Sequence, residues 1–206
     1  VTIEPQPRRS TDVDLEIPVP KRLTQPHPIT AKILAALENG SVNYDGQLLA
    51  DGMRGCPVRV SKDLKSRALR ILDAVIKAVE SRGLKVLLEK GYDRWSLSAV
   101  AGQDKVPFHI REKYGQKKRE ATKEDMSSGG YSSYPRVEYF AKGELLLEIE
   151  RPHSSNLQLR WADTKRQQLE EKVGGVVLAI EAAVVAERRN REHWEAWRRE
   201  REEEQR

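Results

Sequence analysis

The chain has 206 residues, of which 38% are hydrophobic and 33% are charged. This length suits one core of ordinary size with peripheral segments. The single cysteine, Cys56, excludes an internal disulfide framework, and no stretch has the pattern of a signal peptide. The longest nearly uncharged apolar run, residues 173–180, is far shorter than the roughly 20 residues that span a bilayer. We therefore expect a soluble, cytoplasmic protein.

The net charge is +5 and the isoelectric point is near 9.3. A basic balance permits contact with nucleic acid but does not demonstrate it. The first residue is Val1, and the opening stretch is typical of a linker. We therefore expect the chain to be a fragment of a longer protein.

Six of the ten prolines lie in residues 1–28, which predicts a proline-rich linker followed by a single domain over residues 29–206. Within the linker, Leu15, Ile17 and Val19 alternate with other residues. This alternation favours either an edge strand or an extended segment laid across the domain.

Apolar spacing predicts two helices in the first half of the domain. The first covers residues 29–39 and ends at Gly40, and a loop over residues 41–57 follows it. The second runs from Lys62 to about Arg82, with Ser61 as its N-cap and Gly83 as its stop. Its expected buried face consists of Leu64, Ala68, Ile71, Leu72, Val75 and Val79.

Three short segments then predict an antiparallel meander, over residues 84–90, 95–100 and 106–112. The polar stretch 113–134 predicts a long surface loop. A hairpin is expected over residues 137–141 and 144–150, turning at Lys142-Gly143.

Residues 164–206 predict one long helix that Asp163 or Thr164 caps. Its stripe of Leu169, Val173, Val176, Ile180 and Val184 is expected to close the core, while the charged second half projects into solvent or onto another chain. Glycine destabilises a helix interior, so Gly174-Gly175 predicts either close packing of this turn against the sheet or a kink in the helix. Together these elements predict an α+β fold: a mainly antiparallel sheet of about five strands packed against helices, with a long C-terminal helix.

Two sets of residues are candidates for binding. Lys113, Lys117, Lys118 and Arg119 form a basic cluster beside Tyr114, which is typical either of a phosphate-contacting segment or of a solvated loop. Trp194 and Trp197 lie three residues apart on an otherwise charged helix, which favours a contact with another chain over packing on the chain's own surface.

Catalytic signals are weak. Glu148 and Glu150 on one strand, with Asp163 nearby in sequence, suggest carboxylates that hold Mg²⁺ in a nuclease. A solvent-exposed face of an antiparallel strand explains the same alternation of glutamates, and this explanation is favoured. The four histidines lack the spacing of a zinc site, and no motif for acyl transfer or nucleotide hydrolysis is present. We therefore predict no catalytic residue, no metal and no cofactor.

Several stretches carry a resemblance to a known family: IPVPKRLTQPHPITAKILAAL, VRVSKDLKSRALRILDAVIKAVESRG, VPFHIREK, GELLLEIE and LRWADTKRQQLEEKVGG. From about Ile17 onward they resemble the C-terminal region of a family of uncharacterised bacterial proteins. In that family a helix-turn-helix-like DNA-binding domain comes first and a proline-rich linker follows. The resemblance implies a DNA-associated, regulatory, mobile-element or defence-related protein, and it carries over no catalytic residue.

The sequence as a whole favours a non-enzymatic interaction or oligomerisation module of a bacterial DNA-binding protein that regulates transcription. Its expected partners are a second copy, bound through the C-terminal helix, and DNA, bound through an N-terminal domain. Two alternatives stay open: a metal-dependent nuclease that uses Glu148, Glu150 or Asp163, and direct nucleic-acid binding by the basic cluster.

Overall fold

The computed structural model describes residues 15–119, 136–150 and 157–205. Within these residues a main sheet has the strand order β4-β5-β6-β7-β8, in which all neighbours are antiparallel, and β3 pairs with β6 in parallel. Its strands are β3 (Val58–Arg59), β4 (Lys85–Lys90), β5 (Trp95–Ala101), β6 (Asp104–Arg119), β7 (Arg136–Ile149) and β8 (Arg160–Ala162).

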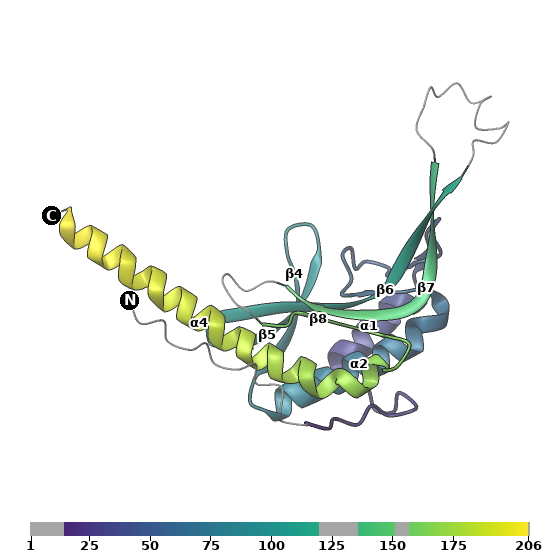
Figure 1. Ribbon diagram of the computed structural model, residues 1–206, viewed down its shortest axis with the longest axis horizontal. Helices are drawn as coiled ribbons and strands as arrows, with labels where there is room; N and C mark the ends of the chain where they lie inside the picture. Colours follow the sequence, from purple (N-terminus) through teal and green to yellow (C-terminus); the bar gives the residue numbers. More distant parts are fainter. Residues whose placement is uncertain (1–14, 120–135, 151–156, 206) are drawn as a thin grey trace, which may run out of the picture.

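The helices are α1 (Pro28–Glu38), α2 (Lys62–Ser81) and α4 (Val173–Glu204), and a short 3₁₀ helix, η1 (Leu169–Lys172), leads into α4. Figure 1 shows α2 and α4 on one side of the sheet, with α4 running far past the sheet edge. The predicted α+β class, with a mainly antiparallel sheet and a long C-terminal helix, is confirmed. No helix in the described part of the chain is both long and apolar enough to cross a bilayer.

The core lies between the sheet and the helices. Alternate residues of β6 and β7 point into it, and each is at most 2% exposed: Val106, Phe108, Ile110, Leu145, Leu147 and Ile149. The predicted stripe of the C-terminal helix meets them and is buried throughout, from Leu169 to Val184. The predicted face of α2 is also buried, except for the half-buried Leu64. The apolar periodicity predicted these faces correctly because each helix has one side that is buried in the core.

The predicted hairpin at Lys142-Gly143 is wrong. Strand β7 runs through both residues, and residues 142–144 form a bulge opposite Lys113 of β6. Gly143 adopts a φ of 71°, and its N–H donates to a side-chain oxygen of the buried Glu112 at 3.0 Å. A glycine in this left-handed conformation serves a bulge as well as a turn, so the local signal did not separate them.

The loop predicted over residues 113–134 is also wrong for its first part. Residues 113–119 continue β6 and pair with β7, whereas residues 120–134 lie outside the described residues. Pairing with β7 satisfies the backbone of this polar segment, so it forms a strand without an apolar face. Residues 113–119 and 136–142 together form the arm that curves away from the sheet in Figure 1.

Two segments differ from expectation. The C-terminal helix starts at Leu169 rather than Thr164; its N-cap residue is Gln168, which forms a capping box with Glu171, while Asp163 accepts the Leu169 N–H at 2.8 Å from six residues before. Ser61 is the N-cap residue of α2, as predicted, although its side chain makes no cap hydrogen bond and its N–H donates to Glu112 at 2.8 Å. The expected loop 41–57 contains a small hairpin of β1 (Ser41–Val42) and β2 (Leu48–Leu49).

The described part of the predicted linker, residues 15–27, is an extended strap against α2 and α4; residues 1–14 lie outside the described residues. Leu15, Ile17 and Val19 are half-buried and alternate with exposed residues. Side chains of α2 donate to strap carbonyls: Arg70 to Pro20 at 2.8 Å, and Lys77 to Gln25 at 2.9 Å. Of the two arrangements expected for this segment, the extended one is observed.

The paired glycines of α4 serve two different contacts. A Cβ built on Gly174 would lie 1.6 Å from the carbonyl oxygen of Leu15 in the strap. A Cβ on Gly175 would lie 3.5 Å from Trp161 of β8, which is an ordinary contact distance. Close packing therefore explains Gly174, but its partner is the strap and not the sheet.

Candidate functional site

The first candidate surface is the part of α4 that leaves the sheet, residues 188–204, which we call the distal helix. At its start Arg191 Nε donates to Asp104 Oδ1 at 2.9 Å, and Arg188 lies 3.5 Å from the same carboxylate. Asp104 is only 5% exposed, and the hydrogen bond from Arg191 outweighs burial and lowers its pKa. This charged contact fixes the direction in which the distal helix projects.

Trp194 and Trp197 lie on the distal helix with 50% and 42% of their surface exposed. Their rings meet edge to face with centroids 5.7 Å apart, and Arg201 lies over the Trp197 ring at 4.9 Å. Positions 176 and 194 are 18 residues apart, about five helical turns, so Trp194 continues the line of the buried Val176. Trp194 therefore extends the core-facing stripe past the edge of the sheet, and Trp197 lies beside it on the next turn.

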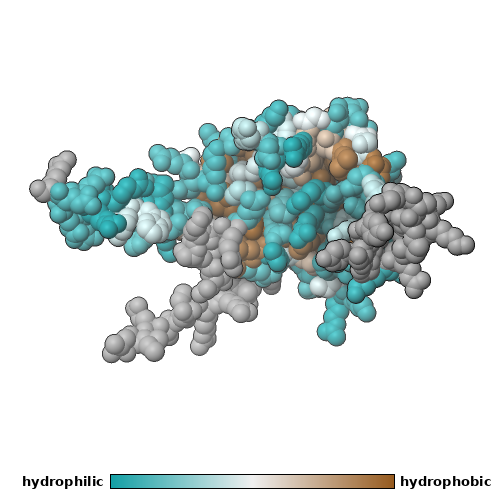
Figure 2. All heavy atoms as spheres, turned by 90° about the horizontal axis from the view of Figure 1, so that it is seen from above, coloured by the Kyte–Doolittle hydropathy of each residue, from teal (hydrophilic) through white to brown (hydrophobic). Residues whose placement is uncertain are grey.

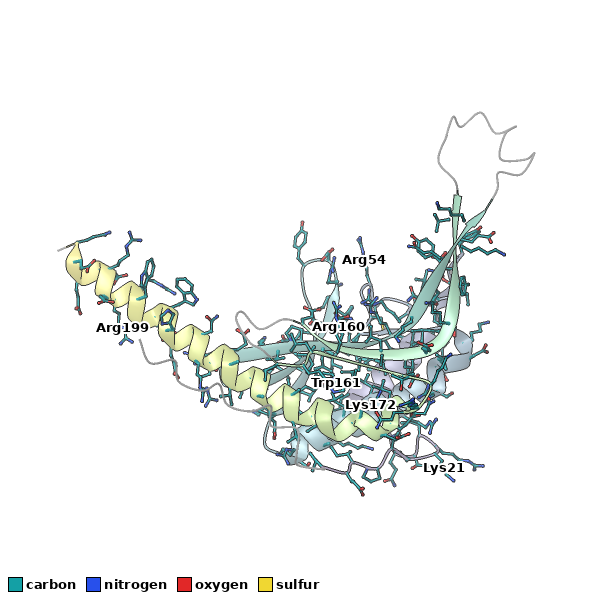
Figure 3. All side chains as sticks on the ribbon, in the orientation of Figure 1. Lys21, Arg54, Arg160, Trp161, Lys172 and Arg199 are labelled. Carbon is teal, nitrogen blue, oxygen red and sulfur yellow. The ribbon has the colours of Figure 1, made fainter. Side chains whose placement is uncertain are left out.

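The second candidate surface is the side of the sheet away from α2 and α4, which we call the open face. Glu148 lies at its centre, opposite His109 on one side and Arg160 on the other. Arg160 Nε donates to Glu148 at 2.6 Å and Arg111 Nη2 at 3.2 Å. Arg59 of β3 is the register neighbour of Arg111. In Figure 3, Arg160 lies on this side of the sheet and Trp161 on the side of α4.

Cations outnumber anions on the open face. Burial alone would raise the pKa of Glu148, but the hydrogen bond from Arg160 and the charges of Arg160 and Arg111 outweigh it and lower the pKa. Burial lowers the pKa of His109, helped by the charge of Arg59. His109 therefore stays neutral near pH 7, although Glu148 lies 3.6 Å away. Two arginines, Arg111 and Arg160, thus share the Glu148 carboxylate, and Arg59 lies beside Arg111 in the register.

A cleft of about 760 Å³ adjoins the open face, between loop 47–56 and the β4–β5 hairpin. It exists because β5 pairs with β6 only over its second half, from Ser98 to Ala101, while the next stretch of β6 pairs with β3. Cationic, aromatic and apolar residues all line it. They include Arg54, Arg59, Lys90, Tyr92, Trp95 and Cys56.

The Cys56 thiol in this cleft is not a nucleophile at neutral pH. Burial raises its pKa from 9.0 to about 11, and the Val58 N–H and the charge of Arg59 only partly offset that rise. A thiol with this pKa is almost wholly protonated at pH 7, and the reactive form is the thiolate.

The predicted basic cluster belongs to the arm rather than to a loop. Lys113 Nζ donates to Glu144 at 2.8 Å, so part of its charge is satisfied. Lys117 and Lys118 are exposed along β6, and Arg119 is the last residue of that strand. The exposed Tyr139 and Phe140 of β7 lie on the same arm.

The structure separates the carboxylates considered for a nuclease. Glu148 lies on the open face, whereas Asp163 lies on the core side, where its Oδ2 accepts from Arg67 at 2.7 Å and from the Leu145 N–H at 2.7 Å. Glu150 is 62% exposed at its side chain and lies 3.9 Å from His109. Within the described residues no three histidine, cysteine or acidic side chains form a group suited to a metal ion.

The candidates that sequence reasoning missed are Arg54, Arg59, Arg111 and Arg160. They come from a loop and three strands far apart in the sequence, so no local pattern unites them. The alternation in β6 and β7 indicated that one face is wet, which was the available signal. Only the sheet register brings these side chains together.

No family model, no curated protein and no solved structure matches this chain significantly.

Proposed function

We propose that the chain is a self-association module, in which the distal helix pairs with the same helix of a second copy. The observation that carries this proposal is the half-exposed pair of Trp194 and Trp197 at the end of the core-facing stripe. Aromatic side chains of this kind are enriched in the centres of protein interfaces. On the face that Figure 2 shows, the projecting part of α4 is mostly hydrophilic, and Trp194 and Trp197 are the exposed large hydrophobic residues of the described distal helix.

The helix itself needs a partner. In proteins, most of the stability of a helix comes from packing of one face against a partner, and an isolated helix is only marginally stable in water. The distal helix is held at its start by Asp104, and beyond that point Figure 1 shows it apart from the rest of the described chain. Pairing with a second copy covers the tryptophans and supplies the missing packing.

The order of charges favours an antiparallel pair. Arg188, Arg189 and Arg191 lie near the start of the distal helix, and Glu202, Glu203 and Glu204 lie at its end. When Trp194 of one copy lies beside Trp197 of the other, Arg189 comes level with Glu202, and Arg188 with Glu203. A parallel pair would bring like charges together, and it would also align the two helix dipoles.

Such a pair has a two-fold axis, so each copy contributes the same patch. The resemblance implies a DNA-binding domain before this one in the whole protein. A two-fold pair of these modules would hold two such domains in a fixed relation, as suits a two-fold DNA site. This arrangement supports a role in transcription regulation.

Sedimentation equilibrium of the chain across micromolar concentrations tests the proposal. We expect a dimer for the wild type and a monomer for the Trp194→Ala/Trp197→Ala variant. Val185→Ala is the matched control, because Val185 is 44% exposed on the opposite face of α4 and its replacement should leave the dimer intact. A wild-type chain that stays monomeric at high concentration contradicts the proposal.

Disulfide trapping tests the orientation. Asn190→Cys and Arg201→Cys variants are mixed and oxidised, each in a Cys56→Ala background. Asn190 and Arg201 lie four residues from Trp194 and Trp197 on the same face of the helix, and they come level in the antiparallel pair. The antiparallel pair predicts a cross-link between the two different variants and little between identical ones. Predominant links between identical variants would contradict the antiparallel order.

A further inference from the structure

The cleft between loop 47–56 and the β4–β5 hairpin contains the kinds of groups that recognise a nucleotide. Arg54, Arg59 and Lys90 bring positive charge to it, and Asp93 is the acidic residue of its lining. Within the described residues no hydrogen bond or ion pair uses the side chains of Arg54, Arg59 or Lys90. Their charges are therefore available to an anion.

Trp95 supplies a fixed aromatic surface at the cleft. Its indole N–H donates to the Gly52 carbonyl at 3.2 Å, and its backbone N–H donates to the Arg54 carbonyl at 2.8 Å. Lys32 lies over the ring, 4.4 Å from its centroid. Tyr92, at the tip of the β4–β5 hairpin, is fully exposed at 106%. An aromatic residue this exposed has no packing role within the described chain.

The cationic surface continues from the cleft onto the open face. Arg59 belongs to both, and its strand neighbour is Arg111, which shares Glu148 with Arg160. Glu148 is the shared acceptor that holds two of these guanidinium groups in place. The Nε of Arg111 is buried and has no hydrogen-bond partner in the described structure.

Rings beside a run of cations are the features that bind single-stranded nucleic acid. Bases stack on aromatic side chains, and phosphates follow the positive charges without strict sequence preference. We propose that the cleft and the open face bind single-stranded nucleic acid, with a base against Tyr92 or Trp95 and phosphates along Arg54, Arg59, Arg111 and Arg160. This binding goes beyond self-association and does not depend on it.

The test is fluorescence anisotropy of a labelled oligothymidylate of about 12 nucleotides with the whole chain. We expect the Arg54→Ala/Arg59→Ala variant to bind at least tenfold more weakly. The slope of log affinity against log salt should also fall by about 1.4, since each lost phosphate contact in a single strand contributes about 0.7. Tyr92→Ala should weaken binding about tenfold through lost stacking.

The matched control is Lys21→Ala/Arg22→Ala, which removes the same net charge from exposed residues of the strap. Figure 3 shows Lys21 on the opposite side of the molecule from Arg54. This control should change the affinity less than twofold. An equal loss in both double variants would overturn the proposal, because binding would then follow net charge alone.

Two further ligands decide the ligand class. A blunt duplex of the same length should bind more weakly than the single strand, and tighter duplex binding would overturn the proposal. Thymidine monophosphate should compete only at much higher concentration. Equal affinity for the monophosphate would overturn the assignment to a strand, since the cleft would then be sufficient without the open face.

Discussion

Arg67 of α2 and Asp163, just after β8, are joined by two parallel hydrogen bonds, Nη1 to Oδ2 at 2.7 Å and Nη2 to Oδ1 at 2.8 Å. Asp163 also accepts the N–H groups of Leu145 and Leu169, and Arg67 also donates to Glu170. One buried carboxylate thus ties together α2, β7 and the start of the C-terminal helix. The sequence suggested Asp163 as a helix cap or a metal ligand; in the structure Gln168 is the N-cap residue, and Asp163 is the acceptor of a buried network.

Replacing Arg67 should destabilise the fold strongly. Arg67→Met leaves Asp163 buried without its cation, and breaking such a pair costs about 3 to 5 kcal/mol. We expect about 3 kcal/mol, because two backbone N–H groups still bind the carboxylate. Urea denaturation measures the loss. Arg70→Met is the control. Because Arg70 donates to one strap carbonyl, this variant should lose less than about 1 kcal/mol in the free energy of unfolding. A loss equal to that of Arg67→Met would contradict this account.

The cluster of Arg67, Asp163 and Glu170 should make the free energy of unfolding depend on pH in the acid range. The hydrogen bond from Arg67 outweighs burial and lowers the pKa of Glu170 below 4.5. Burial alone would raise the pKa of Asp163, but Arg67 and the two N–H groups outweigh it and lower the pKa below 3.8. The unfolded chain therefore takes up these protons at higher pH than the folded chain does. The stabilisation is complete above about pH 5 and is lost as pH falls through the lowered folded values.

Urea denaturation of the wild type and of Arg67→Met from pH 7 to pH 3 checks this. The difference in the free energy of unfolding should be constant above about pH 5 and should shrink below pH 4. A difference that stays constant down to pH 3 would show that Arg67 acts by packing and not by charge.

His109 should make stability depend on pH in a higher range. Burial, with the charge of Arg59, lowers its pKa below 6.5 in the folded chain. As pH falls below 6.5, the unfolded chain gains a proton that the folded chain does not, so the wild type loses stability. His109→Gln should lose less between pH 7 and pH 5 in urea denaturation. Parallel losses in both proteins would sink this prediction.

The two glycines of α4 should respond oppositely to alanine. Alanine favours a helix over glycine by about 1 kcal/mol. Gly174→Ala should nevertheless lower the midpoint of thermal unfolding, because its Cβ meets the Leu15 carbonyl at 1.6 Å and the strap must move. Gly175→Ala should be neutral or stabilising, since its nearest contact is at 3.5 Å. If Gly174→Ala is as stable as Gly175→Ala, the strap does not pack there.

The predictable parts of the fold were those with one dry face. The helical stripe from Leu169 to Val184 and the alternation of Val106, Phe108 and Ile110 each indicate a buried side, because apolar side chains repeat with the period of their element. The part of the arm in β6, residues 113–119, was missed because its residues are mostly polar and show no apolar alternation. The bulge was missed because Gly143 is equally suited to a turn.

The two candidate surfaces also differ in how far the sequence predicts them. Trp194 and Trp197 lie on adjacent turns of one helix, so the sequence alone singled out the distal helix as a candidate surface, and its partner stays a prediction. Arg59, Arg111 and Arg160 are unrelated in sequence, so no pattern identified the open face.

By itself, the sequence determined the helices and the core strands that carry an apolar face, and which side of each is buried, since these depend on short-range periodicity and hydrophobic burial. Only the tertiary structure decided what each buried side meets, that Gly174 serves the strap, and that Asp163 binds Arg67 on the face opposite Glu148. The physical reason is that strand register and helix packing bring together residues more than a hundred positions apart, and neither distance nor direction between them is encoded locally.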